Sequence, residues 1–181
     1  NFRDLAGTTS AFSTAGDGTM RSGVFYRSNA LTPSAADLVT LNSLGIKAIS
    51  DLRTPSEIAA TPDTMLTGAS YENIDIIGST TSGSNITTVS FKSAADAIAM
   101  MEQTNRAFVS DAGMRSQFTR LFNELASVEG AALFHCTAGK DRTGWTAAVL
   151  QSIAGVDNAT IMSNYLATND YTAARVAATL G

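Results

Sequence analysis

The sequence predicts a single α/β domain in which a mostly parallel central sheet is flanked by helices. Short apolar segments of strand type alternate along the chain with longer segments of helical periodicity. A length of 181 residues suits one domain with a sizeable core and is too short for two. No internal repeat or linker-like stretch divides the chain, so residues 1–181 are expected to form one domain.

The N-terminal third contains a strand followed by a helix. Val24-Phe25-Tyr26 is a short apolar run of strand type, preceded by turn residues at 16–18. Thr32-Pro33 is expected to open a helix, because threonine offers a cap oxygen and proline fits the first helical position. Gly45 is expected to end that helix in the left-handed conformation. The inner face of the helix consists of three leucines, Leu38, Leu41 and Leu44.

The middle of the chain adds two strands and two helices. Residues 46–52 and 70–77 have the apolar content of buried strands. Residues 91–128 have helical periodicity, interrupted near Ser110-Asp111 and Gly113, so two helices are expected there. The segment 78–90 is rich in Gly, Ser and Thr, and long loops of this kind often serve as lids. We treat a lid over the site as a hypothesis.

A continuous apolar run at residues 131–135 ends directly at Cys136. Such a run is typical of a central parallel strand covered on both faces. Residues 143–154 have helical spacing, and Asp157-Asn158 is expected to begin another helix. The predicted order around Cys136 is therefore strand, loop, helix.

Composition excludes several classes of function. The net charge of −4, without a basic run, does not suggest a nucleic-acid partner. No apolar stretch approaches the length of a membrane span. The lone cysteine cannot form an internal disulfide, so it does not indicate a redox compartment. The scarcity of lysine is compatible with a secreted or periplasmic protein, and a cytoplasmic one is not excluded.

The segment from His135 to Gly144, HCTAGKDRTG, has the composition of an anion-binding loop. Backbone N–H groups between Thr137 and Arg142 can surround one tetrahedral anion, and a helix N-terminus adds a favourable dipole. Gly139 allows a backbone conformation that a side chain would hinder. Arg142 is spaced to bind two oxygens of a phosphate through its planar guanidinium. The cradle residues are Thr137, Ala138, Gly139 and Lys140.

The same loop favours nucleophilic chemistry at Cys136. A thiol facing N–H donors and an arginine is expected to ionise readily, and a thiolate can attack phosphorus to form a phosphocysteine. Thr143 is expected to donate its hydroxyl to the sulfur. A Walker loop is rejected, because it needs glycine at Phe134 and Ser or Thr at Asp141. A zinc site is equally unsupported, since the chain has one histidine and one cysteine.

Cys136 to Arg142 forms the C-x5-R signature, and the chain resembles the atypical bacterial tyrosine/lipid phosphatases of the protein tyrosine phosphatase superfamily. Further segments agree with that family in the same order, so the resemblance covers essentially the whole chain. They are residues 1–5 (NFRDL), 23–28 (GVFYRS), 51–53 (DLR) with Glu57, and 163–171 (SNYLATNDY). The family generally continues with more helix, so we expect Gly181 to be a truncation. Its pattern has a second glycine where Ala6 stands here, with little expected effect.

The resemblance also implies roles for individual residues. Tyrosine phosphatases often take the general acid from a loop after the strand that corresponds to 70–77, but residues 76–80 hold no carboxylate. Asp75 is interpreted as a structural residue within that strand. The related lipid phosphatases carry an aspartate in the cradle, so Asp141 ranks first as general acid and Asp51 second. For Asp51, a structural aspartate is an almost equal alternative.

The charged residues around the loop suggest a polyanionic substrate. Lys140 resembles the cradle lysine of phosphoinositide phosphatases, although a solvated lysine is an acceptable alternative. Arg53 is expected to line the site or to hold the fold through a carboxylate. His135 is expected to hydrogen-bond within the loop and orient it.

The predicted function is a cysteine-dependent phosphatase acting on phosphotyrosine, with phosphoserine, phosphothreonine and phosphoinositides as further candidates. A phosphorylated protein or a phosphoinositide is the expected partner, with no metal or organic cofactor. Two alternatives remain open. A sulfurtransferase or arsenate reductase is distant, because small arsenate reductases carry the loop near the N-terminus and need further cysteines. A non-catalytic phosphate-binding module would commonly lose Cys136, Arg142 or Asp141, and all three are present.

Overall fold

The computed structural model describes residues 1–80 and 92–180. Its main sheet has five strands in the order β1-β4-β7-β5-β6. β4, β7, β5 and β6 run parallel, and β1 pairs antiparallel with β4 at one edge. The bounds of these strands are β1 Arg3–Asp4, β4 Phe25–Ser28, β5 Ile46–Asp51, β6 Ser70–Asn73 and β7 Ala131–His135. The expected mostly parallel α/β architecture is confirmed.

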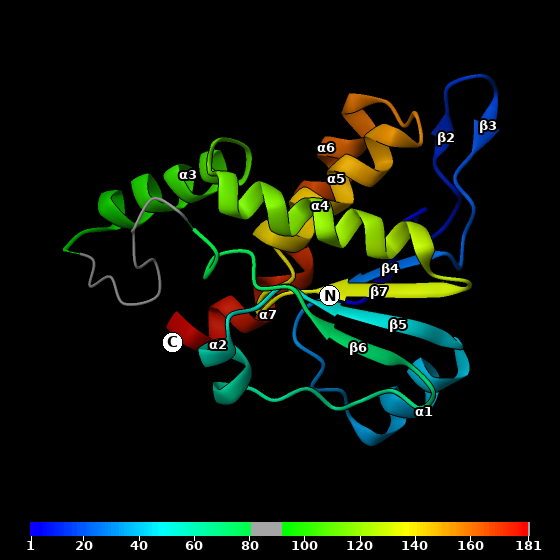
Figure 1. Cartoon of the computed structure of the whole chain (residues 1–181), viewed down its shortest axis with the longest axis horizontal. Coiled ribbons are helices and arrows are strands. Elements are labelled where there is room, and N and C mark those ends of the chain that lie inside the picture. The colour runs from blue at the N-terminus through cyan, green and yellow to red at the C-terminus, as the bar shows by residue number, and fades with distance from the viewer. Residues whose placement is uncertain (81–91, 181) are drawn as a thin grey trace.

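Helices cover both faces of this sheet. Figure 1 shows α3, α4 and α5 above the sheet and α1 below it, while the carboxyl ends of β5, β6 and β7 point towards α2. A small hairpin of β2 and β3, Ser13–Thr14 and Gly18–Thr19, stands apart from the sheet. The helices are α1 Ala35–Ser43, α2 Pro55–Ala60, α3 Ala94–Ser110, α4 Ala112–Ser127, α5 Asp141–Ile153, α6 Asn158–Leu166 and α7 Thr168–Leu180.

Strand β7 lies at the centre of the core. Its five residues are all buried, and successive side chains alternate between two apolar clusters. Ala132 and Phe134 belong to the cluster formed with α3, α4 and α5, whereas Ala131 and Leu133 belong to the cluster with α1. A strand packed on both faces gives the loop that follows it a rigid starting point.

Several boundaries differ from the sequence prediction. Helix α1 begins at Ala35, where Ser34 rather than Thr32 is the cap and accepts from the Asp37 N–H. The break between α3 and α4 falls at Asp111, which caps α4 through the Met114 N–H, so Gly113 lies inside α4. The predicted left-handed Gly45 is confirmed with φ 65°.

The strand expected over residues 70–77 is shorter than predicted. It ends at Asn73, whose side-chain amide donates to the carbonyl oxygens of Asp51 and Arg53. Ile74 and Ile76 are still fully buried, but in a loop. Asp75 therefore belongs to the loop after the strand, and its interpretation as a strand residue is wrong. Most of the segment 78–90, where a lid was hypothesised, lies outside the described residues.

Within the described ranges no helix combines the length and the apolar character needed to cross a bilayer.

Candidate active site

The segment 136–142 connects the end of β7 to the start of α5. Cys136 follows β7 directly and is 2% exposed. Helix α5 begins at Asp141, and no side chain caps its N-terminus, whereas side chains cap α1, α2, α3, α4 and α6. The amide groups of this first turn are therefore available to an anion.

Gly139 permits the tight path of the loop. Its φ is +66°, and a Cβ atom there would lie 2.5 Å from the Ser28 carbonyl oxygen and 2.7 Å from the Asn29 nitrogen. The expectation that a side chain would hinder this position is therefore confirmed. The loop is also tied to the rest of the chain, because the Asn1 side-chain amide donates to the carbonyls of Ala138 and Gly139.

Arg142 is held by a carboxylate from α2. Its Nη1 donates to Glu57 Oε2 at 2.7 Å and to the Leu52 carbonyl at 3.0 Å, and its Nη2 donates to Glu57 Oε1 at 2.6 Å. A guanidinium has five N–H groups, and these bonds use three of them. Nε–H and one N–H of Nη2 have no partner among the described residues, so two adjacent donors are free for an oxyanion.

Glu57 is fixed from several sides. Thr54 and Glu57 form a capping box at the start of α2, and the Thr137 hydroxyl donates to Glu57 Oε1 at 2.5 Å. Burial opposes ionisation of Glu57, but the hydrogen bonds and charge of Arg142 outweigh it and lower the pKa of Glu57 to about 2. Burial likewise acts to lower the pKa of Arg142, and Glu57 with Cys136 raises it overall.

Thr143 and Lys140 differ in their surroundings. Thr143 is fully buried, and its hydroxyl has no hydrogen-bond partner in the described part of the chain, so the expected bond to Cys136 is not formed in this structure. Lys140 is exposed. It lines a cavity of about 500 Å³ together with residues of α3, namely Ala97, Ile98, Met101, Glu102, Asn105 and Arg106.

Asp51 and Arg53 form a buried ion-pair cluster with Asp63. Arg53 donates to both oxygens of Asp51 and, at 2.6 Å, to Asp63 Oδ2. The Tyr71 hydroxyl adds a bond of 2.8 Å to Asp51 Oδ2. Arg53 and Asp51 are both 0% exposed. A substrate in solvent has no access to these side chains, so the placement argues against Arg53 as a substrate ligand and against Asp51 as general acid.

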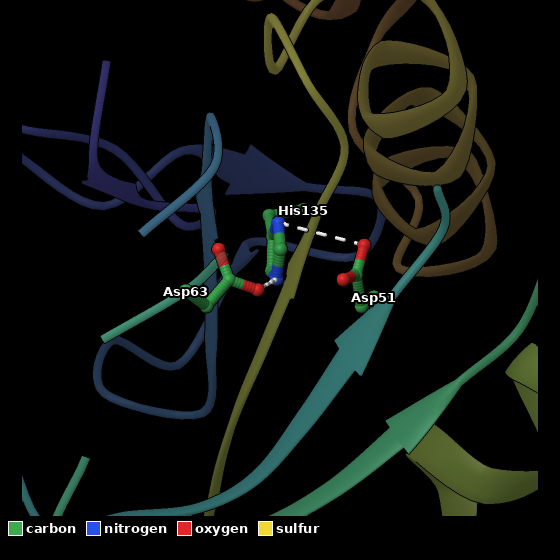
Figure 2. A group of neighbouring side chains, drawn as sticks. All are labelled: Asp51, Asp63 and His135. Carbon is green, nitrogen blue, oxygen red and sulfur yellow. Dashed lines mark ion pairs between the residues drawn. The ribbon is translucent and has the colours of Figure 1, made fainter. Parts of the chain in front are cut away.

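His135 belongs to the same cluster. Figure 2 shows its ring between Asp63 and Asp51, with Nε2 3.2 Å from Asp63 Oδ2 and Nδ1 3.9 Å from Asp51 Oδ1. Its side chain faces these carboxylates instead of the loop backbone, contrary to expectation. Two carboxylates and an imidazole are a set that a metal ion can use. Here Arg53 already donates to both carboxylates, so the geometry fits an ion-pair cluster better than a metal centre.

Two carboxylates remain near the cradle. Asp141 is the first residue of α5 and is partly exposed. Asp75 accepts from the Gly78 N–H at 2.7 Å. Burial raises the pKa of Asp75, and the charge of Glu57 adds to that effect against the opposing charge of Arg142. A carboxyl group that retains its proton above the usual range is suited to general acid work.

Sequence reasoning missed the roles of Glu57 and Asp75. The signal for Glu57 is present in Thr54-Pro55-Ser56-Glu57, a capping-box pattern that fixes the carboxylate at the start of a helix. Its contact with Arg142, 85 residues away, is a tertiary feature that the pattern does not reveal. The signal for Asp75 is weaker, because the apolar residues around it also fit a strand.

Together these features place the chain among α/β proteins in which a short loop joins the end of a central strand to the uncapped first turn of a helix. The model of the tyrosine phosphatase family matches residues 1–180. The chain belongs to this family.

Two relatives and one solved structure illustrate the similarity. A tyrosine-protein phosphatase of Nostoc commune is 36% identical over 140 residues, which are 75% of this chain and 45% of the relative. The triple specificity protein phosphatase PtpB of Mycobacterium tuberculosis is 31% identical over 193 residues, covering 94% of this chain and 67% of PtpB. The crystal structure of P. aeruginosa TpbA in complex with pTyr has a TM-score of 0.42 at 17% identity, covering 88% of this chain and 80% of TpbA. The chain thus spans about half to two thirds of the length of these curated relatives.

Proposed function

We propose that this protein is a phosphatase that hydrolyses phosphate monoesters through a phosphocysteine on Cys136. The observation that carries the proposal is how the guanidinium of Arg142 is held and oriented. Glu57 holds its guanidinium beside the uncapped first turn of α5, and two of its N–H groups have no partner in the described part of the chain. An arginine fixed in this way is preorganised for a phosphate dianion and for the charge that develops on its oxygens during transfer.

The proposed reaction has two steps. In the first, the Cys136 thiolate attacks phosphorus, a sulfur–phosphorus bond forms and the bond to the ester oxygen breaks. The leaving oxygen takes a proton from a carboxylic acid. In the second step water attacks the phosphocysteine, gives its proton to the same carboxylate, and inorganic phosphate leaves with regeneration of the thiolate. The Thr143 hydroxyl is buried next to this loop and can turn to donate to the sulfur as it leaves.

Asp141 is the proposed general acid, because it lies in the cradle itself and is partly exposed. Asp75 is a second candidate, supported by its raised pKa and its electrostatic interaction with Arg142. Asp51 is assigned a supporting role instead: it neutralises Arg53 beneath the loop.

We propose phosphotyrosine as the main substrate class, with phosphoserine, phosphothreonine and phosphoinositides as further substrates. The relatives' names support the first, and the name of PtpB, a triple specificity protein phosphatase, supports a broader range. Lys140 favours polyanionic substrates, since it is exposed in a cavity where Arg106 pairs with Glu102 and Lys140 supplies the net positive charge. Apolar side chains of the same cavity, Ile98 and Met101, suit an aromatic or acyl portion of the substrate.

The test is phosphate release, without added metal, from a phosphotyrosine peptide, a phosphoserine peptide and phosphoinositide vesicles. The proteins compared are wild type, Cys136→Ser, Lys140→Met and the distant surface control Lys47→Met. We expect Cys136→Ser to abolish release, and Lys140→Met to reduce release from phosphoinositides more than from phosphotyrosine. Phosphate binding without release from any substrate would contradict the proposal and favour a phosphate-binding module.

A further inference from the structure

Two of the buried arginines in the described part of the chain have no carboxylate partner. Arg53 and Arg142 each pair with an acidic side chain. Arg3 and Arg27, which are 3% and 1% exposed, pair with none. Burying an uncompensated charge is costly, so such a pair requires another source of negative charge.

Arg3 and Arg27 lie directly opposite each other on neighbouring strands. They are register partners in the antiparallel pair of β1 and β4, so their side chains share one face of the sheet. Like charges in this arrangement repel, and burial lowers the pKa of Arg27 to about 9, with Arg3 adding to the effect. Negative charge on Cys136 or on Tyr165 acts in the opposite direction, so both side chains lie within electrostatic range of Arg27.

The hydrogen bonds of Arg27 lead to the back of the cradle. Its Nη2 donates to the Gly139 carbonyl at 2.9 Å and to Thr168 Oγ1 at 3.3 Å, whereas its Nε and Nη1 have no partner among the described residues. In a trans peptide the C=O and the next N–H point in opposite directions. A bond that holds the Gly139 carbonyl on one side therefore directs the Lys140 N–H to the other side.

Arg3 supports this arrangement from a second position. It donates to the side-chain oxygen of Asn1 and, at 2.9 Å, to Thr168 Oγ1, and its guanidinium lies 4.9 Å from the centre of the Tyr171 ring. Asn1 in turn donates to the carbonyls of Ala138 and Gly139. Two consecutive carbonyls of the loop are thus held from the outside by one connected set of donors.

We propose that Arg27 is a positioning residue of the cradle: it fixes the Gly139 peptide so that the Lys140 N–H faces the anion, and it supplies a second, buried positive charge to the thiolate and the bound oxyanion. This inference rests on the proposed function, since it requires that the cradle hold an anion. It differs from the role of Arg142, because Arg27 is buried behind the loop and does not touch the substrate.

The test compares Arg27→Met with Arg27→Lys and with a surface control, Arg120→Met. Arg120 pairs with Glu72 on the exposed side of the molecule. Two quantities are measured in the full chain: the pH midpoint of Cys136 alkylation by iodoacetamide, and the affinity for tungstate by calorimetry. Among the described residues, the charged or titratable groups that interact with the thiol include Arg142 of α5, Arg27 of β4 and Tyr165 of α6, and only Arg27 is changed.

We expect Arg27→Met to raise the alkylation midpoint by about one pH unit and to weaken tungstate binding about tenfold. Arg27→Lys keeps the charge, so its alkylation midpoint should lie close to that of wild type. If Arg27→Met does not fold, Arg27→Gln and Arg27→Lys give the same comparison between a neutral and a charged side chain of similar length.

A folded neutral variant with an unchanged midpoint and unchanged tungstate affinity would overturn the proposal, as would a loss of thermal stability alone. Failure of the proposed function has a different result. In that case wild type itself would show neither tungstate binding nor a thiol that reacts at neutral pH, whatever residue stands at position 27.

Discussion

Glu57 accepts hydrogen bonds from both terminal nitrogens of Arg142, at 2.7 and 2.6 Å, and so joins the first turn of α2 to the first turn of α5. The two helices follow different strands, β5 and β7, which are neighbours in the sheet. The orientation of the arginine is therefore set by the sheet through α2, and not by the loop alone.

Replacing Glu57 with glutamine should reduce kcat/KM about a hundredfold, because a small misplacement of a positioned group has an effect of this size. Glutamine can still close the capping box, so the helix start is retained. Steady-state kinetics with a phosphotyrosine peptide provide the measurement, with Glu72→Gln as the matched control on the surface. Equal kinetics for the two variants would rule out a functional role for the Glu57–Arg142 pair.

The same pair should make stability depend on pH in a defined window. The pKa of Glu57 is lowered from 4.5 to about 2 in the folded protein, so the folded state binds its proton more weakly than the unfolded state. Its contribution is present in full above pH 4.5 and is lost as the pH falls towards about 2. The free energy of unfolding of wild type minus that of Glu57→Gln, measured by denaturant titration between these pH values, should decrease with acidification. A difference that stays constant would contradict this assignment.

The identity of the general acid can be decided by comparing Asp141→Asn with Asp75→Asn. The true acid is needed most for poor leaving groups, because a good leaving group departs without a proton. The variant that lacks the general acid should lose far more activity on phenyl phosphate than on p-nitrophenyl phosphate. The other variant should lose activity on the two substrates to the same extent. If the ratio of the activities on the two substrates is unchanged in both variants, neither Asp141 nor Asp75 is the general acid.

Gly139→Ala tests how closely the loop packs, and Gly45→Ala is its matched control. Both glycines have nearly the same positive φ, 66° and 65°, but only Gly139 has backbone atoms within reach of a Cβ. Both variants should lose about 1 kcal/mol of stability through backbone strain. Gly139→Ala should lose more than this, because its Cβ atom would also meet the Ser28 carbonyl oxygen and the Asn29 nitrogen. Only Gly139→Ala should also lose oxyanion affinity, as measured by tungstate calorimetry. Similar affinities in both would mean that the loop adapts freely.

Asp51→Asn should destabilise the fold by about 3 kcal/mol, because a neutral amide replaces the charged acceptor of buried hydrogen bonds from Arg53 and Tyr71. The turnover of the folded fraction should change little. Urea titration combined with active-site counting separates the two effects. A variant with native stability and no turnover would restore Asp51 as the general acid.

The fold and the strand–loop–helix order around Cys136 follow directly from the sequence. The run 131–135 predicts a strand buried on both faces, and its side chains do alternate between the two apolar clusters. The left-handed glycines at 45 and 139 are equally predictable, because few other residues adopt that conformation. These features depend on local chemistry alone.

The parts that the sequence does not predict depend on tertiary contacts. Apolar residues such as Ile74 and Ile76 have the same pattern in a strand and in a buried loop, so the early end of β6 is not visible in it. Helix α7 exposes most of its residues, so its apolar positions carry little periodic signal. The sequence alone does not show which of several acidic residues pairs with Arg53 or with Arg142, because the pairing depends on how the strands are arranged.

The donors behind the cradle come from distant parts of the chain. Asn1 contacts Gly139 across 138 residues, and Arg3 contacts Thr168 across 165. Contacts with such separations form late in folding, because long stretches of chain must be ordered before they give any stabilisation. During synthesis, β1 and β4 leave the ribosome long before β7, α5 and Thr168 exist to meet them. The cradle is therefore completed only near the end of folding, and any ligand that it binds stabilises the native chain without assisting its earlier stages.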